Sequence, residues 1–181
     1  MNKFVNAMKL LRKKYILPII IITILLNYYK RKNHAKYPVF LRVYDLSKGK
    51  AAIFSEPLFG YKIDGVWHTS IEVHDKEIWF GKGITHCKPG ESSHGAPIKR
   101  IEMGLTKKSP KALEKFIKSV SNRFHKQKYH LLKNNCNHFS NELALFLVNE
   151  NIPDYIINLA DEIGKNPKAM QMLDLFKIII E

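Results

Sequence analysis

Cysteine is scarce in this chain of 181 residues, which contains only Cys87 and Cys136. Two cysteines cannot build the disulfide framework of a small secreted domain, although they could form one bridge in an oxidising lumen. In a reducing compartment, a cysteine with a histidine elsewhere in the chain is instead a candidate nucleophile. That second interpretation is the sharper one, and it requires a folded domain that faces the cytosol.

Acidic residues are absent before Asp45, whereas nine of the 30 Lys and Arg residues lie in residues 1–36. The rest of the chain has 21 basic and 16 acidic residues, so its net charge is only +5 of the total of +14. A nucleic-acid-binding domain would carry its basic excess on the folded part, and we therefore expect no nucleic-acid partner. Basic clusters that flank an apolar segment more often contact anionic lipid headgroups.

Residues 15–29 read YILPIIIITILLNYY and form an almost continuous apolar run. As a helix this run would be about 22 Å long, which is short against a hydrocarbon core of about 30 Å. A cleaved signal peptide, an uncleaved anchor and an insertion that does not cross all remain open. The following residues offer no small-residue cleavage site, which favours an uncleaved membrane anchor. We predict that residues 1–36 form this basic, anchoring N-terminus and a short linker.

The remainder of the chain predicts an α+β domain over residues 37–166, because strand patterns precede helical ones. Ser109 followed by Pro110 indicates a helix start, and Asn134 or Asn135 can cap a helix that begins near Cys136. A further helix is expected from Pro153, with an interruption at 164–167. A C-terminal amphipathic helix is expected within 167–181. We expect strands at 39–44, 66–74, 77–80 and 98–103 and a loop at 81–95.

Cys136 is the strongest candidate for chemistry, because it heads the apolar stripe of its helix in the first turn. A helix N-terminus stabilises a thiolate, and its free N–H groups can hold an oxyanion. A neighbouring histidine would lower the pKa of the thiol further by forming an ion pair. The alternative is a small buried apolar residue without a chemical role.

His68 is the favoured partner, since strand alternation places it on the polar face of its strand. A half-exposed strand histidine without a catalytic role is the alternative. His138 projects from a different side of the helix than Cys136 does. A zinc site built from His86, Cys87 and His94 is disfavoured, because their spacing matches no strong ligand pattern.

Four blocks of the sequence together resemble the PPPDE family, also called the DeSI desumoylating isopeptidases, which are permuted papain-fold cysteine peptidases. The match covers about residues 38 to 165, and residues 152–156 (IPDYI) also fit the run after the nucleophile helix. The blocks are PVFLRVYDLS (38–47), GVWHTSI (65–71), FGKGI (80–84) and NCNHFSNE (135–142).

The resemblance implies a dyad in which Cys136 is the nucleophile and His68 the general base, with no metal or cofactor. It implies a small antiparallel sheet packed with helices, and removal of ubiquitin or SUMO from protein lysines. Family members also hydrolyse protein thioesters, so an S-acyl thioesterase at the membrane surface is an alternative. Expected partners are therefore conjugates of a ubiquitin-like modifier or acylated proteins, and a homodimer fits the resemblance. A non-catalytic, membrane-tethered binding module is a third hypothesis, disfavoured by the presence of both Cys136 and His68.

Overall fold

The computed structural model describes residues 12–34 and 36–171, which fall into two units that divide after Lys36. The N-terminal unit contains a π-helical turn η1 (Arg12–Ile16) and the helix α2 (Leu17–His34). Thr23 fits this helix by donating its hydroxyl to the carbonyl of Ile19, at 2.8 Å. Most of the large apolar side chains between Tyr15 and Tyr28 are about half exposed or more.

The helix α2 confirms a helical N-terminal segment, but the predicted anchor at 15–29 is not supported as a membrane span. Of the helices that the structure describes, none combines the length and the apolar character that crossing a bilayer needs.

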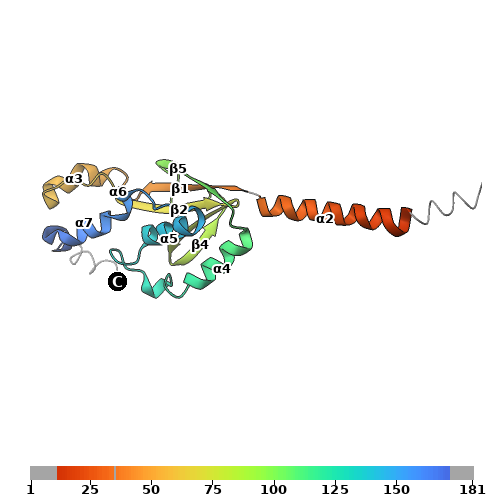
Figure 1. The fold of residues 1–181 in the computed structure, drawn as a ribbon. Helices are drawn as coiled ribbons and strands as arrows, with labels where there is room; N and C mark the ends of the chain where they lie inside the picture. The colour runs from red at the N-terminus through yellow and green to blue at the C-terminus, as the bar shows by residue number, and fades with distance from the viewer. Residues whose placement is uncertain (1–11, 35, 172–181) are drawn as a thin grey trace, which may run out of the picture. The chain divides into compact units, whose positions relative to one another are not determined.

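The second unit is built on one antiparallel sheet of five strands with the order β4-β3-β2-β1-β5 (Figure 1). In the pairing of β1 with β2, Tyr44 lies directly opposite His68. The α+β prediction is therefore confirmed as a mixed helix and sheet fold. The strands are β1 (Tyr37–Asp45), β2 (Trp67–Val73), β3 (Lys76–Gly81), β4 (Gly83–Cys87) and β5 (Lys99–Thr106).

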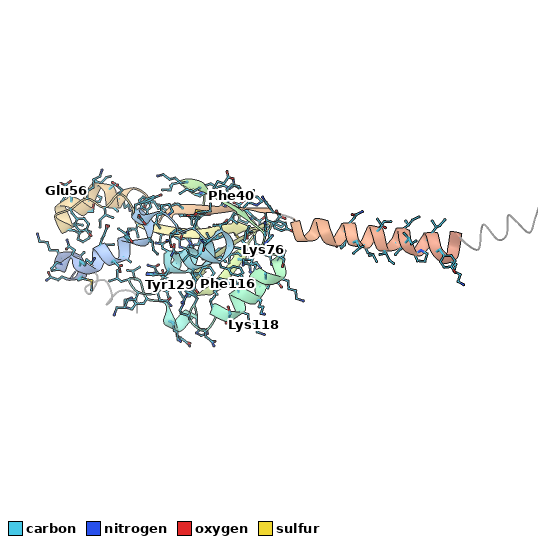
Figure 2. The ribbon with its side chains drawn as sticks, viewed as in Figure 1. Phe40, Glu56, Lys76, Phe116, Lys118 and Tyr129 are labelled. Carbon is cyan, nitrogen blue, oxygen red and sulfur yellow. The ribbon has the colours of Figure 1, made fainter. Side chains whose placement is uncertain are left out.

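Helix α5 (Cys136–Val148) packs against this sheet, and α4 (Pro110–Val120) packs against α5. Phe116 of α4, labelled in Figure 2, stacks on Phe146 of α5 with the ring centroids 4.2 Å apart. Ser109 caps α4 by accepting a hydrogen bond from the N–H of Ala112, as its sequence signature predicts. The core joins the apolar face of the sheet to the inner stripe of α5: Val39, Leu41, Val43, Ile71, Ile78, Phe80, Phe139, Leu143 and Leu147.

The other helices of this unit are short. They are α3 (Lys50–Phe59), the 3-10 turn η2 (Lys126–Lys128), α6 (Asp154–Ile157) and α7 (Leu159–Lys165). The chain leaves α7 at Asn166, within the predicted interruption. Residues 167–171 are helical, and the rest of the predicted C-terminal helix, 172–181, lies outside the described residues.

Two features differ from the sequence prediction. The segment 81–95 was predicted as a loop, but its first part forms β4, because each residue from Gly83 to Cys87 pairs with β3. Helix α3 was not predicted either, and it places a helix between the first two strands. Its start depends on a local turn: the carboxylate of Asp45 accepts from the N–H groups of Ser47 and Gly49, at 2.9 and 2.6 Å.

Candidate active site

Cys136 is the first residue of α5, as predicted, and its neighbour Asn135 is the cap. The side-chain oxygen of Asn135 accepts hydrogen bonds from the N–H groups of Asn137 and His138, at 2.9 and 3.1 Å. The ring of His138 accepts in return from the N–H of Asn135, at 3.3 Å. His138 is therefore part of a capping box, and the thiol of Cys136 is held in a rigid first turn, only 4% exposed.

Asn137 ties this turn to strand β2. Its amide oxygen accepts from the hydroxyl of Thr69, and its amide nitrogen donates to the carbonyl of Trp67, both at 2.9 Å. Ser140, one turn further along α5, also donates to the carbonyl of Thr69, at 3.2 Å. The residues on both sides of His68 are thus fastened to the helix that begins with Cys136.

His68 is buried, with 5% of its surface exposed. Its ring stacks on that of His94, with centroids 3.9 Å apart and an interplanar angle of 25°, and the ring of Tyr44 lies 5.9 Å away. Its Nε2 has no hydrogen-bond partner among the described residues. The fold therefore brings the strand of His68 to the helix of Cys136, but the hydrogen bonds of the described residues include none between the two side chains.

The thiol hydrogen-bonds weakly to its own neighbour, since Sγ of Cys136 donates to Oδ1 of Asn137 at 3.6 Å. Burial raises the pKa of Cys136 above its ordinary value, although the backbone of Thr69 and the hydroxyl of Tyr129 act in the opposite direction. Tyr129, labelled in Figure 2, has its own pKa raised by burial and by Cys136.

Burial, with a smaller contribution from the neighbouring His94, lowers the pKa of His68 to about 3, although Glu77 acts in the opposite direction. The conformation described here therefore holds a neutral thiol and a neutral imidazole. The ion pair expected from the sequence is not formed in it, because both side chains are out of water and are not joined to each other.

A buried carboxylate organises the polar face of the sheet beside His68. Glu77 has no exposed surface, and its oxygens accept from Tyr44 Oη at 2.5 Å, Ser70 Oγ at 2.8 Å and the N–H of Gly90 at 2.9 Å. Its charged neighbour is Arg42, whose Nε lies 3.8 Å from Oε2 of Glu77. These bonds outweigh burial, so the pKa of Glu77 is lowered.

Sequence reasoning did not single out Asn137, Glu77, Tyr44 or His94 for the site. Strand alternation carried a usable signal for two of them, because a tyrosine and a glutamate interrupt apolar strands on the same face as His68. The roles of Asn137 and His94 depend on how separate segments meet, and no spacing rule reveals that.

Cys87 lies on β4, and both cysteines are free thiols. Its Sγ donates to the carbonyl of Lys88 at 3.0 Å, so it takes no part in the arrangement around Cys136. The described residues hold no group of three or more side chains that could bind a metal ion. The ring of His94 packs against those of His68 and Trp79. The disfavoured zinc site would instead need it to bind a metal together with His86 and Cys87.

An apolar cavity of about 230 Å³ adjoins the nucleophile turn. Asn135 and Asn137, the two neighbours of Cys136, form its polar wall. The other walls come from β2, α3, α7 and nearby loops, and include Phe59, Ile63, Trp67, Leu132, Leu159 and Ile163. The cavity can hold an apolar group close to the thiol.

Comparison with known proteins agrees with this arrangement. The PPPDE putative peptidase domain matches residues 37–175. The chain is 41% identical to the human protein named desumoylating isopeptidase 1 over 145 residues, which cover 79% of this chain and 86% of that protein. It is 41% identical to the protein of the same name from Rattus norvegicus over 133 residues (72% and 79%). The corresponding Xenopus laevis protein is 40% identical over 139 residues (76% and 82%).

The domain match covers the folded unit from Tyr37 onward, and the human relative is 41% identical over 79% of the chain. The chain therefore belongs to the PPPDE peptidase family and is a cysteine-type hydrolase.

Proposed function

We propose that this protein is a thiol isopeptidase that removes a ubiquitin-like modifier, SUMO in the first instance, from lysine side chains. The names of its relatives support the reaction and the modifier. The single observation that carries the proposal is the position of Cys136 at the capped start of α5, tied through Asn137 to both neighbours of His68.

In the proposed reaction, His68 takes the proton of Cys136, and the thiolate attacks the terminal carbonyl carbon of the modifier. The carbon–nitrogen bond of the isopeptide breaks, and the lysine amine leaves with the proton from His68. Water then hydrolyses the thioester and regenerates the thiol. Substrate binding must bring the sulfur of Cys136 and the imidazole of His68 into hydrogen-bond contact, because the thiol of the described conformation bonds to Asn137 instead.

The helix start can also stabilise the oxyanion of this reaction, but with fewer donors than the sequence suggested. Asn135 already occupies the N–H groups of Asn137 and His138. This cap leaves the N–H of Cys136 as the donor of the first turn that can point at a developing negative charge.

Labelling by SUMO or ubiquitin that carries a C-terminal electrophile tests this proposal. We expect a covalent adduct on the full chain that is lost in Cys136→Ala and kept in Cys87→Ala. His68→Ala should lower the hydrolysis rate by about 10²–10⁴-fold while leaving the circular dichroism unchanged. Labelling that survives Cys136→Ala would sink the assignment of the nucleophile.

A protein S-acyl thioesterase is the second candidate, and the apolar cavity beside Asn135 and Asn137 favours it. A fatty acyl chain could lie there while its thioester carbon meets Cys136, and the same acyl-enzyme route applies. A fluorogenic acyl thioester distinguishes the two candidates. Faster turnover of this substrate than of a SUMO or ubiquitin conjugate would favour the thioesterase.

Membrane association through the N-terminal unit is part of the proposal, with the catalytic domain in the cytosol. The exposed apolar side chains between Tyr15 and Tyr28 support it, because so much apolar surface is unfavourable in water. Flotation of the full chain with anionic vesicles should be lost in the double variant Ile20→Lys, Ile24→Lys. Equal flotation of variant and parent would argue against insertion of this helix.

A further inference from the structure

His94 shares a packed aromatic cluster with the proposed general base. Its ring stacks on His68, lies edge-on to Trp79 with centroids 5.4 Å apart, and packs near Tyr44 at 5.5 Å. It comes from the loop that follows β4, whereas His68 lies on β2 and Trp79 on β3. Tertiary structure therefore brings the two imidazoles together, and 25 intervening residues separate them in the chain.

The loop that carries His94 is fixed at two points before it reaches that ring. The N–H of Gly90 donates to the buried carboxylate of Glu77, at 2.9 Å. The hydroxyl of Ser92 donates to the hydroxyl of Tyr44, at 3.3 Å, and Tyr44 in turn donates to Glu77. The buried carboxylate of Glu77 thus holds the loop directly at the backbone of Gly90 and, through Tyr44, at the side chain of Ser92.

The stack limits how His68 can be oriented. Nε2 of His68 and Nδ1 of His94 are both buried and lack a hydrogen-bond partner among the described residues. Hydrogen bonds at these nitrogens therefore do not orient the two rings. Ring-to-ring packing, which favours offset and tilted aromatic arrangements, is the contact that remains to set the angle of the His68 ring.

We propose that His94 is a positioning residue, whose ring holds the imidazole of His68 in the orientation from which it reaches the thiol of Cys136. The inference depends on the proposed catalytic role of His68. A solvent-filled space at position 94 would let the His68 ring rotate and hydrate. Positive charge on His94 would also disfavour protonation of His68, and burial of both rings acts in the same direction.

The other groups around the pair determine which way a pH profile should move. Tyr44 on β1 packs against both rings and donates to Glu77 on β3, and Arg42 on β1 lies 3.8 Å from that carboxylate. Of these, only Glu77 favours a charged His68, and burial prevails over it. Removing the ring of His94 should therefore raise the pKa of His68.

The test compares His94→Ala, which removes the ring, with His94→Phe, which keeps a ring but cannot be charged. His86→Ala is the matched control, because His86 is an exposed histidine on the adjacent strand β4. We expect His94→Ala to lower kcat about tenfold with little change in KM, and to move the acidic limb of the profile up by about one pH unit. His94→Phe should restore kcat to within about twofold, and His86→Ala should match the parent.

A second measurement does not need activity. The ring proton resonances of His68, assigned by comparison with His68→Ala, are followed through a pH titration in the full chain. A changed titration in His94→Ala supports the inference, and a titration and kcat identical to the parent overturn it. If His68→Ala hydrolyses substrate normally, the proposed function fails instead, and the resonances still report whether His94 orients that ring. Should His94→Ala not fold, His94→Gln replaces it in both measurements.

Discussion

The amide of Asn137 joins the hydroxyl of Thr69 at 2.9 Å, across the boundary between α5 and β2. The same amide donates to the carbonyl of Trp67. One side chain next to the proposed nucleophile therefore determines where the strand with the proposed base lies. We therefore expect changes at Asn137 to affect the site as well as the stability of the fold.

Asn137→Ala should reduce both stability and activity. The change leaves the buried hydroxyl of Thr69 and the partly buried carbonyl of Trp67 without this partner, so we expect a loss of about 2 kcal/mol in the free energy of unfolding, measured by urea denaturation. Asn141→Ala is the control on the same helix, because Asn141 bonds to Asn151 and to the N–H of Ile152, away from β2. It should lose stability but keep kcat/KM, and an equal loss of kcat/KM in both variants would refute the positional role of Asn137.

The cap of α5 predicts a separation of stability from reactivity. Asn135→Ala should cost about 1–2 kcal/mol in the free energy of unfolding, because the N–H groups of Asn137 and His138 lose their acceptor. Asn135→Asp keeps an acceptor and should keep most of that stability. Its negative charge next to the sulfur should nevertheless raise the pKa of Cys136 and slow labelling by an electrophilic probe. Unchanged labelling in Asn135→Asp would show that a charge at position 135 does not alter the pKa of the Cys136 thiol.

The resting thiol should react slowly with small reagents. Burial raises the pKa of Cys136 and lowers that of His68 to about 3, so little thiolate is present at neutral pH. In a Cys87→Ala background, the rate of alkylation by iodoacetamide should rise steadily with pH through the alkaline range. A rate that stays level between about pH 5 and about pH 7 would instead reveal a preformed ion pair. A SUMO or ubiquitin probe should label much faster than iodoacetamide if substrate binding completes the dyad.

Glu77 should make stability depend on pH. Its hydrogen bonds lower the pKa below the ordinary value of 4.5, so the folded state binds the proton less readily than the unfolded chain does. The stabilisation is then complete above that value and is lost as the pH falls through the folded pKa. Glu77→Gln should lower the free energy of unfolding by about 3 kcal/mol near neutral pH and flatten its acid dependence. Glu56→Gln, on the exposed surface of α3 (Figure 2), is the control that should change neither.

The sequence predicted the elements whose signals are local. Ser109 with Pro110 marked the start of α4, and the spacing of Phe139, Leu143 and Leu147 marked the inner face of α5. Helix α3 escaped prediction, because Pro57 lies inside it and its start depends on the carboxylate of Asp45, not on a strong cap. β4 escaped because glycine and proline in 81–95 suggest a loop, whereas pairing with β3 forms the strand.

The same distinction holds in the site. The motif around Cys136 located the helix start and the motif around His68 located the strand, and the structure places both where those motifs indicate. The neutral state of the two groups could not be predicted, since it depends on burial by segments distant in the sequence. The sequence indicated His94 only as a weak zinc ligand. Its stacking on His68 could not be predicted, because no regular spacing in the sequence indicates that two rings will stack.

Tyr44 lies opposite His68 in the pairing of β1 with β2, and this pairing has a consequence for how the domain must fold. A displacement of β1 by one residue would turn its side chains to the opposite face of the sheet, so that Tyr44 would leave the face that carries His68. The tight turn at His74 and Asp75 imposes the alignment of β2 with β3, but the long connection through α3 imposes none on β1 and β2. The alignment of β1 with β2 therefore depends on their side chains, and a slipped β1 would leave His68 in place without Tyr44 beside it.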